Sequence, residues 1–147
     1  MAESAEGTER IGASAPDVMA VITDFEAYPE WAGVKSAKVL ATDEQGRGAE
    51  VAYEIDAPVI GSVIYTLAYA YEDDDRGCSW TTRQIEGKIR DIQGQYVLEE
   101  LDEDETDVTY RLAVDVGIPL PGFMKKEAAK QIVNTGLGGL KKRVEGG

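Results

Sequence analysis

The C-terminal stretch of the chain, residues 119–145, predicts one long helix and limits what the rest can fold into. It contains no proline after Pro121, and Pro121 is placed to start the helix, where the missing N–H of proline costs no hydrogen bond. Its apolar residues recur mostly at spacings of three to five and predict one apolar face. They are Phe123, Ile132, Val133, Leu137, Leu140 and Val144. The other face is basic, with Lys125, Lys126, Lys130, Lys141, Lys142 and Arg143. Such a helix needs an apolar surface to cover.

Three glycines interrupt this predicted helix: Gly136, Gly138 and Gly139. Each costs about 1 kcal/mol relative to alanine in a helix interior. One interpretation is close packing of the helix backbone against a sheet. A second is that the absent side chains leave room for a ligand beneath the helix, and a third is a weak helix that frays.

The preceding chain alternates apolar and polar residues with the period of two that is typical of half-buried strands. After a first strand ending near Ile11 and two short helices within 14–31, six further strands are expected around residues 34–42, 49–55, 63–71, 78–85, 94–98 and 110–114. Breaks are expected at 43–46, 56–61, 72–77 and 86–91, and an acidic hairpin loop at 101–107. Consecutive short strands followed by one helix predict a single α+β domain, residues 1–147, with an antiparallel sheet.

Composition excludes several classes of function. The net charge of −13 argues against nucleic acid as a partner. The chain contains no histidine, which excludes Ser-His-Asp, Cys-His and His-based metal sites, so we expect no metal. A single cysteine, Cys78, forms no internal disulfide and is expected to be inert. The acidic N-terminus is unlike a signal peptide and no run is apolar enough to span a membrane, so a cytoplasmic location is expected.

Tyrosine is over-represented among the aromatic residues, with seven Tyr against two Phe. Alternation places most of these tyrosines on the sheet face that meets the helix. Because a buried phenol needs a partner for its hydroxyl, this bias indicates a cavity dotted with polar groups. The alternative is that the tyrosines lie at strand ends and reach water. Trp80 lines the same cavity or fills the core, and Arg83 pairs with a carboxylate in the pocket or points outward.

Three stretches carry a resemblance to a known superfamily. They are Ala13–Val18 with Asp24–Trp31 and Val39–Leu40; Ser79–Trp80 with Glu86–Gly87, Gly94–Leu98 and Thr106–Tyr110; and Gly117–Phe123 leading into the helix. In order and spacing they resemble the START-like superfamily, also called the polyketide cyclase/dehydrase and lipid-transport or Bet v 1-like group. The resemblance spans nearly the whole chain. It implies the helix-grip fold, a curved seven-stranded antiparallel sheet around a long C-terminal helix, with two short helices after the first strand.

The resemblance also implies a cavity between sheet and helix that holds a hydrophobic molecule. The residues expected to bind it are Tyr53, Tyr65, Leu67, Tyr69, Trp80, Tyr96, Tyr110, Phe123, Val133 and Leu137. The main hypothesis is non-catalytic binding or transport of a lipid, quinone or polyketide-like molecule, with no cofactor and no catalytic residue. Two alternatives stay open: a polyketide aromatase/cyclase, and a protein-interaction module that docks through the basic helix. The sequence fits either a monomer or a homodimer.

Overall fold

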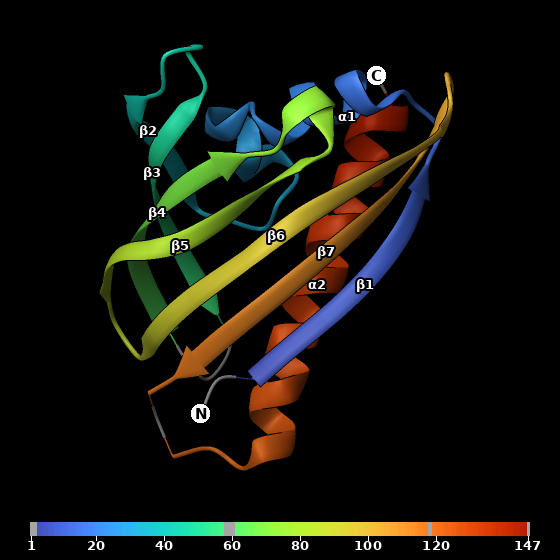
Figure 1. The fold of residues 1–147 in the computed structure, drawn as a ribbon. Coiled ribbons are helices and arrows are strands. Elements are labelled where there is room, and N and C mark those ends of the chain that lie inside the picture. Colours follow the sequence, from blue (N-terminus) through green and yellow to red (C-terminus); the bar gives the residue numbers. More distant parts are fainter. Residues whose placement is uncertain (1–2, 58–60, 118, 147) are drawn as a thin grey trace.

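One antiparallel sheet curves around a single long helix in the computed structural model, which describes residues 3–57, 61–117 and 119–146 (Figure 1). The strands are β1 (Glu3–Ile11), β2 (Ser36–Thr42), β3 (Gly48–Ala57), β4 (Gly61–Tyr71), β5 (Gly77–Glu86), β6 (Ile89–Asp102) and β7 (Glu105–Val116). The helices are α1 (Ala15–Ile22), the 3₁₀ helices η1 (Phe25–Glu30) and η2 (Asp73–Asp75), and α2 (Gly122–Glu145). No helix within the described residues is long and apolar enough to cross a bilayer.

The sheet has the order β1-β7-β6-β5-β4-β3-β2, and every neighbouring pair is antiparallel. The predicted α+β class and helix-grip architecture are therefore confirmed. Alternation along the strands decides which side chains meet α2: on β7, Val108, Tyr110, Leu112, Val114 and Val116 are buried and their neighbours are not. The apolar face is thus continuous from strand to strand and forms the core beneath the helix.

Helices α1 and η1 carry the chain from β1 to β2, which lie at opposite edges of the sheet. Ser14 caps α1 by accepting a hydrogen bond from the Asp17 N–H at 3.3 Å. The Tyr28 hydroxyl donates to the Ile22 carbonyl, one of the oxygens that the end of α1 would otherwise leave unpaired. This corner encloses one end of the space between sheet and helix.

Helix α2 packs most closely against β1 and is tied down near its C-terminal end. Lys141 Nζ donates to the Arg10 carbonyl at 2.5 Å, and the Glu145 carboxylate accepts from the Gly12 N–H at 2.8 Å. Arg143 forms an ion pair with Glu30 at 3.0 Å. From 122–131, by contrast, no side-chain hydrogen bond or ion pair reaches another element in the described chain.

Three details of the sequence interpretation were wrong. The acidic run 101–107 is not a loop, because β6 continues to Asp102 and β7 starts at Glu105. Asp102, Glu103 and Asp104 lie on exposed positions of a long hairpin. Thr106, between the half-buried Glu105 and Asp107, is buried and donates to the Ala13 carbonyl at 2.8 Å. The expected loop 86–91 is shorter, because Ile89 begins β6 and is 2% exposed. The predicted position of Pro121 at the start of the helix is confirmed, because Pro121 is the N-cap of α2.

The third error is Phe123, which was assigned to the buried face of the helix but is 75% exposed. It lies in the first turn of α2, which extends past the ends of the strands (Figure 1). No sheet surface is present there for its ring to cover. The predicted break at 56–61 and the 117–123 stretch lie partly outside the described residues.

Candidate ligand-binding cavity

A cavity of about 100 Å³ lies between the concave side of the sheet and α2. We call it the inner chamber. It is lined by Tyr28, Ala32, Val34, Tyr53, Ile55, Tyr65, Leu67, Tyr69, Trp80, Ile89, Ile92, Tyr96, Tyr110, Leu112, Val114, Ile132 and Gly136. None of these described lining residues carries a charge at neutral pH. Six of the seven tyrosines of the chain are among them.

Strand register brings these aromatic side chains together. Tyr53 on β3 lies opposite Tyr65 on β4, Tyr69 lies opposite Trp80 on β5, and Tyr96 on β6 lies opposite Tyr110 on β7. Ring contacts join Tyr69, Trp80, Tyr96 and Tyr110, with centroid separations from 4.8 Å for Tyr96–Tyr110 to 5.8 Å for Tyr69–Trp80, and Tyr53 stacks on Tyr65 at 5.3 Å. Because directly opposed residues on one sheet face are close neighbours, this wall follows from the alternation of the strands.

Two glycines shape the chamber by leaving room for aromatic rings. Trp80 pairs with Gly94 across β5 and β6, and its indole occupies the space where a Gly94 Cβ would stand, 2.7 Å away. Gly136 of α2 lies over Tyr110, and a Cβ there would approach the ring to 2.7 Å. The close-packing interpretation of the helix glycines therefore holds for Gly136 and for Gly139, which lies against the Trp31 carbonyl. Gly138 has nothing within 4 Å of its Cβ position and faces outward.

The phenol hydroxyls differ in their hydrogen bonding. Tyr53 and Tyr69 bond to each other at 2.6 Å, and the Tyr28 hydroxyl donates to the Ile22 carbonyl. The hydroxyls of Tyr65, Tyr96 and Tyr110 form no hydrogen bond in the described part of the chain. Tyr71 lies outside the chamber, where its hydroxyl donates to the Gly48 carbonyl at 2.6 Å.

Burial raises the pKa of every tyrosine above its ordinary value, because removal from water disfavours the phenolate. Neighbouring phenols add to the rise of the pKa for Tyr28, Tyr69 and Tyr96. For Tyr53 the hydrogen bond from Tyr69 opposes it in part. All chamber phenols are therefore protonated at neutral pH, and each can both donate and accept a hydrogen bond.

A second pocket of about 220 Å³ adjoins the chamber and leads to the surface. We call it the mouth. It shares Ala32, Ile55, Ile89, Val114 and Ile132 with the chamber. Beyond these it is lined by Gly33, Asp56, Val116, Ala128, Ala129, Gln131 and Thr135. The wall of the mouth is thus largely apolar, with polar groups at the rim, and its helix side is the 122–131 segment and the turn that follows.

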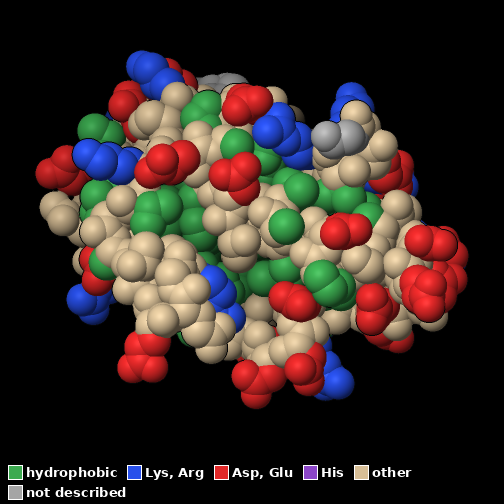
Figure 2. Space-filling model, turned by 90° about the horizontal axis from the view of Figure 1, so that it is seen from above, with side chains coloured by type: hydrophobic (Ala, Val, Ile, Leu, Met, Phe, Trp, Pro, Cys, Tyr) green, Lys and Arg blue, Asp and Glu red, His purple; other side chains and the backbone are tan. Residues whose placement is uncertain are grey.

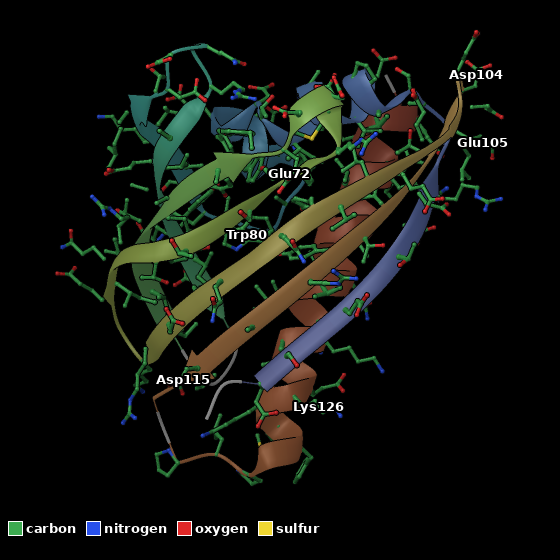
Figure 3. All side chains as sticks on the ribbon, in the orientation of Figure 1. Glu72, Trp80, Asp104, Glu105, Asp115 and Lys126 are labelled. Atoms are coloured by element: carbon green, nitrogen blue, oxygen red, sulfur yellow. The ribbon has the colours of Figure 1, made fainter. Side chains whose placement is uncertain are left out.

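Seven of the ten residues predicted to bind a ligand lie around the chamber: Tyr53, Tyr65, Leu67, Tyr69, Trp80, Tyr96 and Tyr110. Trp80 projects from the middle of the sheet (Figure 3). Val133 and Leu137 are buried, but they pack on Gly7 of β1, where a Cβ would approach them to 3.1 and 3.0 Å. Phe123 lies outside the chamber on the exposed first turn of α2.

The sequence interpretation missed several lining residues. Tyr28 follows Phe25 by three residues, a helical spacing that places both rings on the inner side of η1, with centroids 5.4 Å apart. Ile89 and Ile92 were assigned to a loop or left out, although both are buried on β6. Ile132 belonged to the predicted apolar face of the helix, and only the three-dimensional arrangement shows that it faces the chamber rather than β1.

Other candidate groups lie away from the chamber or are chemically quiet. Arg83 points outward and lies 3.6 Å from Glu50 in an exposed ion pair. Cys78 is buried, which raises the pKa of its thiol to about 12 and keeps it protonated. Lys126 and Lys130 are exposed, as expected for a solvated helix face. Within the described residues, no cluster of three or more metal-ligating side chains is present.

Charge is distributed unevenly between the two ends of the molecule. Seen from above, the end opposite the mouth carries many Asp and Glu side chains (Figure 2). Glu72 beside η2 and Asp104 and Glu105 of the β6–β7 hairpin belong to it, whereas Asp115 and Lys126 lie toward the mouth (Figure 3). Acidic residues therefore gather where the chamber is closed.

A curved seven-stranded sheet with one long helix across its concave side defines the START-like helix-grip fold. Comparison with known proteins agrees. A sequence model of the family described as polyketide cyclase/dehydrase and lipid transport matches residues 2–145, and the chain belongs to this family. No curated protein sequence matches the chain.

Solved structures share the fold over almost the whole chain. A START superfamily protein from Mycobacterium smegmatis is 25% identical, with a TM-score of 0.87 and 97% of each chain covered. Zhui aromatase/cyclase from a Streptomyces species is 14% identical, with a TM-score of 0.82 and coverage of 99% of this chain and 94% of its own. A STAR-related lipid transfer protein from Xanthomonas axonopodis is 21% identical, with a TM-score of 0.71 and coverage of 97% and 85%. The last two show the fold alone.

Proposed function

We propose that this protein binds a hydrophobic or amphipathic small molecule in the chamber and mouth, and carries it without changing it chemically. The observation that carries the proposal is the composition of the chamber wall, where only apolar and phenolic side chains meet. Ligand sites are concave and mostly apolar, with few polar groups that fix orientation. Cys78 is a free thiol, and free thiols are typical of proteins in the reducing cytoplasm. This supports the cytoplasm as the site of action.

The wall also argues against an aromatase/cyclase. Proton abstraction next to a carbonyl needs a base whose pKa lies near the working pH. The chamber phenols have a pKa raised by burial, and the neighbouring Cys78 thiol is protonated as well. These groups can bind oxygen atoms of a ligand, but they take up no proton at neutral pH. We therefore favour binding over catalysis.

The access route is the second part of the proposal. The 122–131 half of α2 has no polar tie to the sheet in the described chain, while Lys141, Arg143 and Glu145 anchor the other half. A ligand reaches the chamber through the mouth, past Ile132, whose side chain lines both spaces. Among the described residues, the side-chain contacts that hold this half of the helix to the sheet are therefore non-polar.

The test combines ligand detection with a variant that blocks this route. Protein purified from its source is analysed by native mass spectrometry for a bound small molecule, and the molecule is then added back while thermal stability is measured. At 100 times its Kd the ligand should stabilise the fold by about 2.7 kcal/mol. Ile132→Trp should abolish both binding and stabilisation.

Ile64→Trp is the matched control, because Ile64 is 50% exposed on the outer face of β4. It should bind as the wild type does. If the wild type carries no small molecule, and lipids, quinones and polyketide-like compounds leave its stability unchanged, the proposed function is wrong.

A further inference from the structure

The six phenols of the inner chamber fall into two sets that point to the chemistry of the ligand. One set is satisfied within the protein: Tyr28 bonds to a carbonyl, and Tyr53 bonds to Tyr69. The other set is Tyr65, Tyr96 and Tyr110, whose hydroxyls have no hydrogen-bond partner in the described chain. All three residues are at most 9% exposed. Buried polar groups in proteins are almost always paired, so three unpaired hydroxyls in one small space need an explanation.

These hydroxyls are open to the chamber rather than sealed in packing. Among the described residues, Trp31 Nε1 is the one side-chain polar atom that is both inaccessible to solvent and without a hydrogen-bond partner. The three phenol oxygens also have no partner, so they are not completely enclosed by protein atoms. They therefore face the open volume that their residues line. A core that needed only bulk would be filled equally well by phenylalanine, which leaves no donor or acceptor unpaired.

Two of the three lie at the deep wall beneath the helix. The rings of Tyr96 and Tyr110 are 4.8 Å apart, and a Cβ on Gly136 would lie 2.7 Å from the Tyr110 ring and 3.8 Å from the Tyr96 hydroxyl. Tyr65 lines the same chamber from β4. No phenol lines the mouth, where Ile55, Val116 and Ala129 contribute instead. Apart from the rim, hydrogen-bonding capacity thus increases from the mouth inward.

We propose that the ligand enters with its polar end first and that its oxygen atoms bind the hydroxyls of Tyr65, Tyr96 and Tyr110. This rests on the proposed function and narrows it to compounds of one or two rings that carry at least two oxygens, such as phenols, quinones or cyclised polyketones. The apolar remainder of the molecule lies in the mouth. A protonated phenol donates to a carbonyl and accepts from a hydroxyl, so both kinds of oxygen are bound.

The volumes set the size of this ligand. A cavity of about 150 Å³ accommodates benzene, and the chamber, at about 100 Å³, is smaller than that, so one small ring is the upper limit for the chamber itself. The mouth adds about 220 Å³ for the remainder. Pockets for drug-sized ligands span roughly 300–1,000 Å³. The space therefore fits the small end of that range, and it excludes sterols and lipids with two acyl chains from the described conformation.

The test uses two probes of the same shape, hexylresorcinol and hexylbenzene, which differ by two hydroxyls. Calorimetry on the full chain should show hexylresorcinol binding at least tenfold more tightly. Each of three variants should lower the affinity for hexylresorcinol by roughly fivefold to tenfold, which corresponds to the loss of one hydrogen bond: Tyr65→Phe, Tyr96→Phe and Tyr110→Phe. The affinity for hexylbenzene should stay unchanged. Tyr71→Phe is the matched control, since its hydroxyl bonds to Gly48 outside the chamber and its loss should leave both affinities unchanged.

Orientation is measured separately by nuclear Overhauser effects in the hexylresorcinol complex. Ring protons of the probe should contact the rings of Tyr96 and Tyr110, and the terminal methyl should contact Val116 and Ala129. The opposite pattern, equal affinity for the two probes, or indifference to all three Tyr→Phe changes would each overturn the inference and leave the carrier function standing. If neither probe binds, the inference is also wrong, and the search for a copurified ligand decides the carrier function by itself.

Discussion

Helix α2 rests on two different surfaces. Toward β1, Val133 and Leu137 pack on Gly7 so closely that a Cβ on that glycine would stand 3.0 Å from Leu137. Toward β3–β7, the same helix stands over rigid aromatic rings and leaves the chamber open. The first surface is aliphatic and closed, and the second is phenolic and hollow. The difference teaches that flexible aliphatic side chains fill the space next to a glycine, whereas flat rings with polar tips leave gaps between them.

The largest expected effect is unfolding at alkaline pH, which results from ionisation of the buried tyrosines on the hollow surface. Burial raises the pKa of all seven tyrosines in the fold, whereas in the unfolded chain they titrate near 10. Above about pH 10 the unfolded state releases protons that the folded state retains, so stability falls as pH rises. Each fully buried phenol contributes a slope of about 1.4 kcal/mol per pH unit.

We therefore expect one cooperative transition above about pH 10. Tyrosinate absorbance and the loss of far-UV circular dichroism should coincide, because the phenols ionise only when the fold opens. Gradual appearance of tyrosinate from pH 10 with unchanged dichroism would show that the rings are accessible to water in the folded protein.

On the closed side the largest effect of a substitution is expected at Leu137. Leu137→Ala removes a side chain that is 4% exposed and leaves a void against Gly7. Such changes cost about 2–5 kcal/mol of unfolding free energy, because the transfer and cavity costs add. Chemical denaturation measures the loss. Leu101→Ala, at a residue 41% exposed, should stay within about 0.5 kcal/mol. A similar loss at both positions would mean that the helix is not tightly seated on β1.

Substitution of the helix glycines by alanine should change the unfolding free energy by a smaller amount, with opposite signs at two positions. At Gly139 a Cβ would collide with the Trp31 carbonyl, a backbone atom that cannot yield, so Gly139→Ala should cost about 1–3 kcal/mol. At Gly138 the Cβ position is open, so Gly138→Ala should gain up to about 1 kcal/mol from helix propensity. Thermal denaturation of the two variants compares them directly. A stabilised Gly139→Ala protein would show that the helix does not approach the η1 corner.

The sheet residues of the hollow surface were easier to predict from sequence than the helix residues that face them. Alternation put Tyr65, Leu67 and Tyr69 on one face of their strand, because residues two apart in a strand share a face. The helix stripe was less reliable. Phe123 and Ile132 are nine residues apart and therefore point to opposite sides of an α-helix, although their spacing was counted toward a single face.

The position of the helix across the sheet could not be predicted from the sequence. Val133 and Leu137 were expected to meet the ligand, but α2 sits toward β1, so these two residues close the edge and Ile132 and Gly136 face the chamber. That offset depends on Gly7, which admits the helix, and on the Tyr110 ring beneath Gly136. Both are contacts between residues more than 25 positions apart in the sequence, and no local pattern encodes them.

The smallest expected change in stability distinguishes a phenol whose hydroxyl is hydrogen-bonded within the fold from one whose hydroxyl has no partner among the described residues. Tyr28→Phe removes the donor to the Ile22 carbonyl and should cost about 1 kcal/mol of unfolding free energy. Tyr96→Phe removes a hydroxyl that bonds to no described residue, so stability should change by less than about 0.5 kcal/mol. Both variants keep the ring, so packing is conserved, and chemical denaturation compares them in ligand-free protein. An equal loss in the two would mean that the Tyr96 hydroxyl is already satisfied by the fold, and the chamber would then have no unpaired phenol there to offer a ligand.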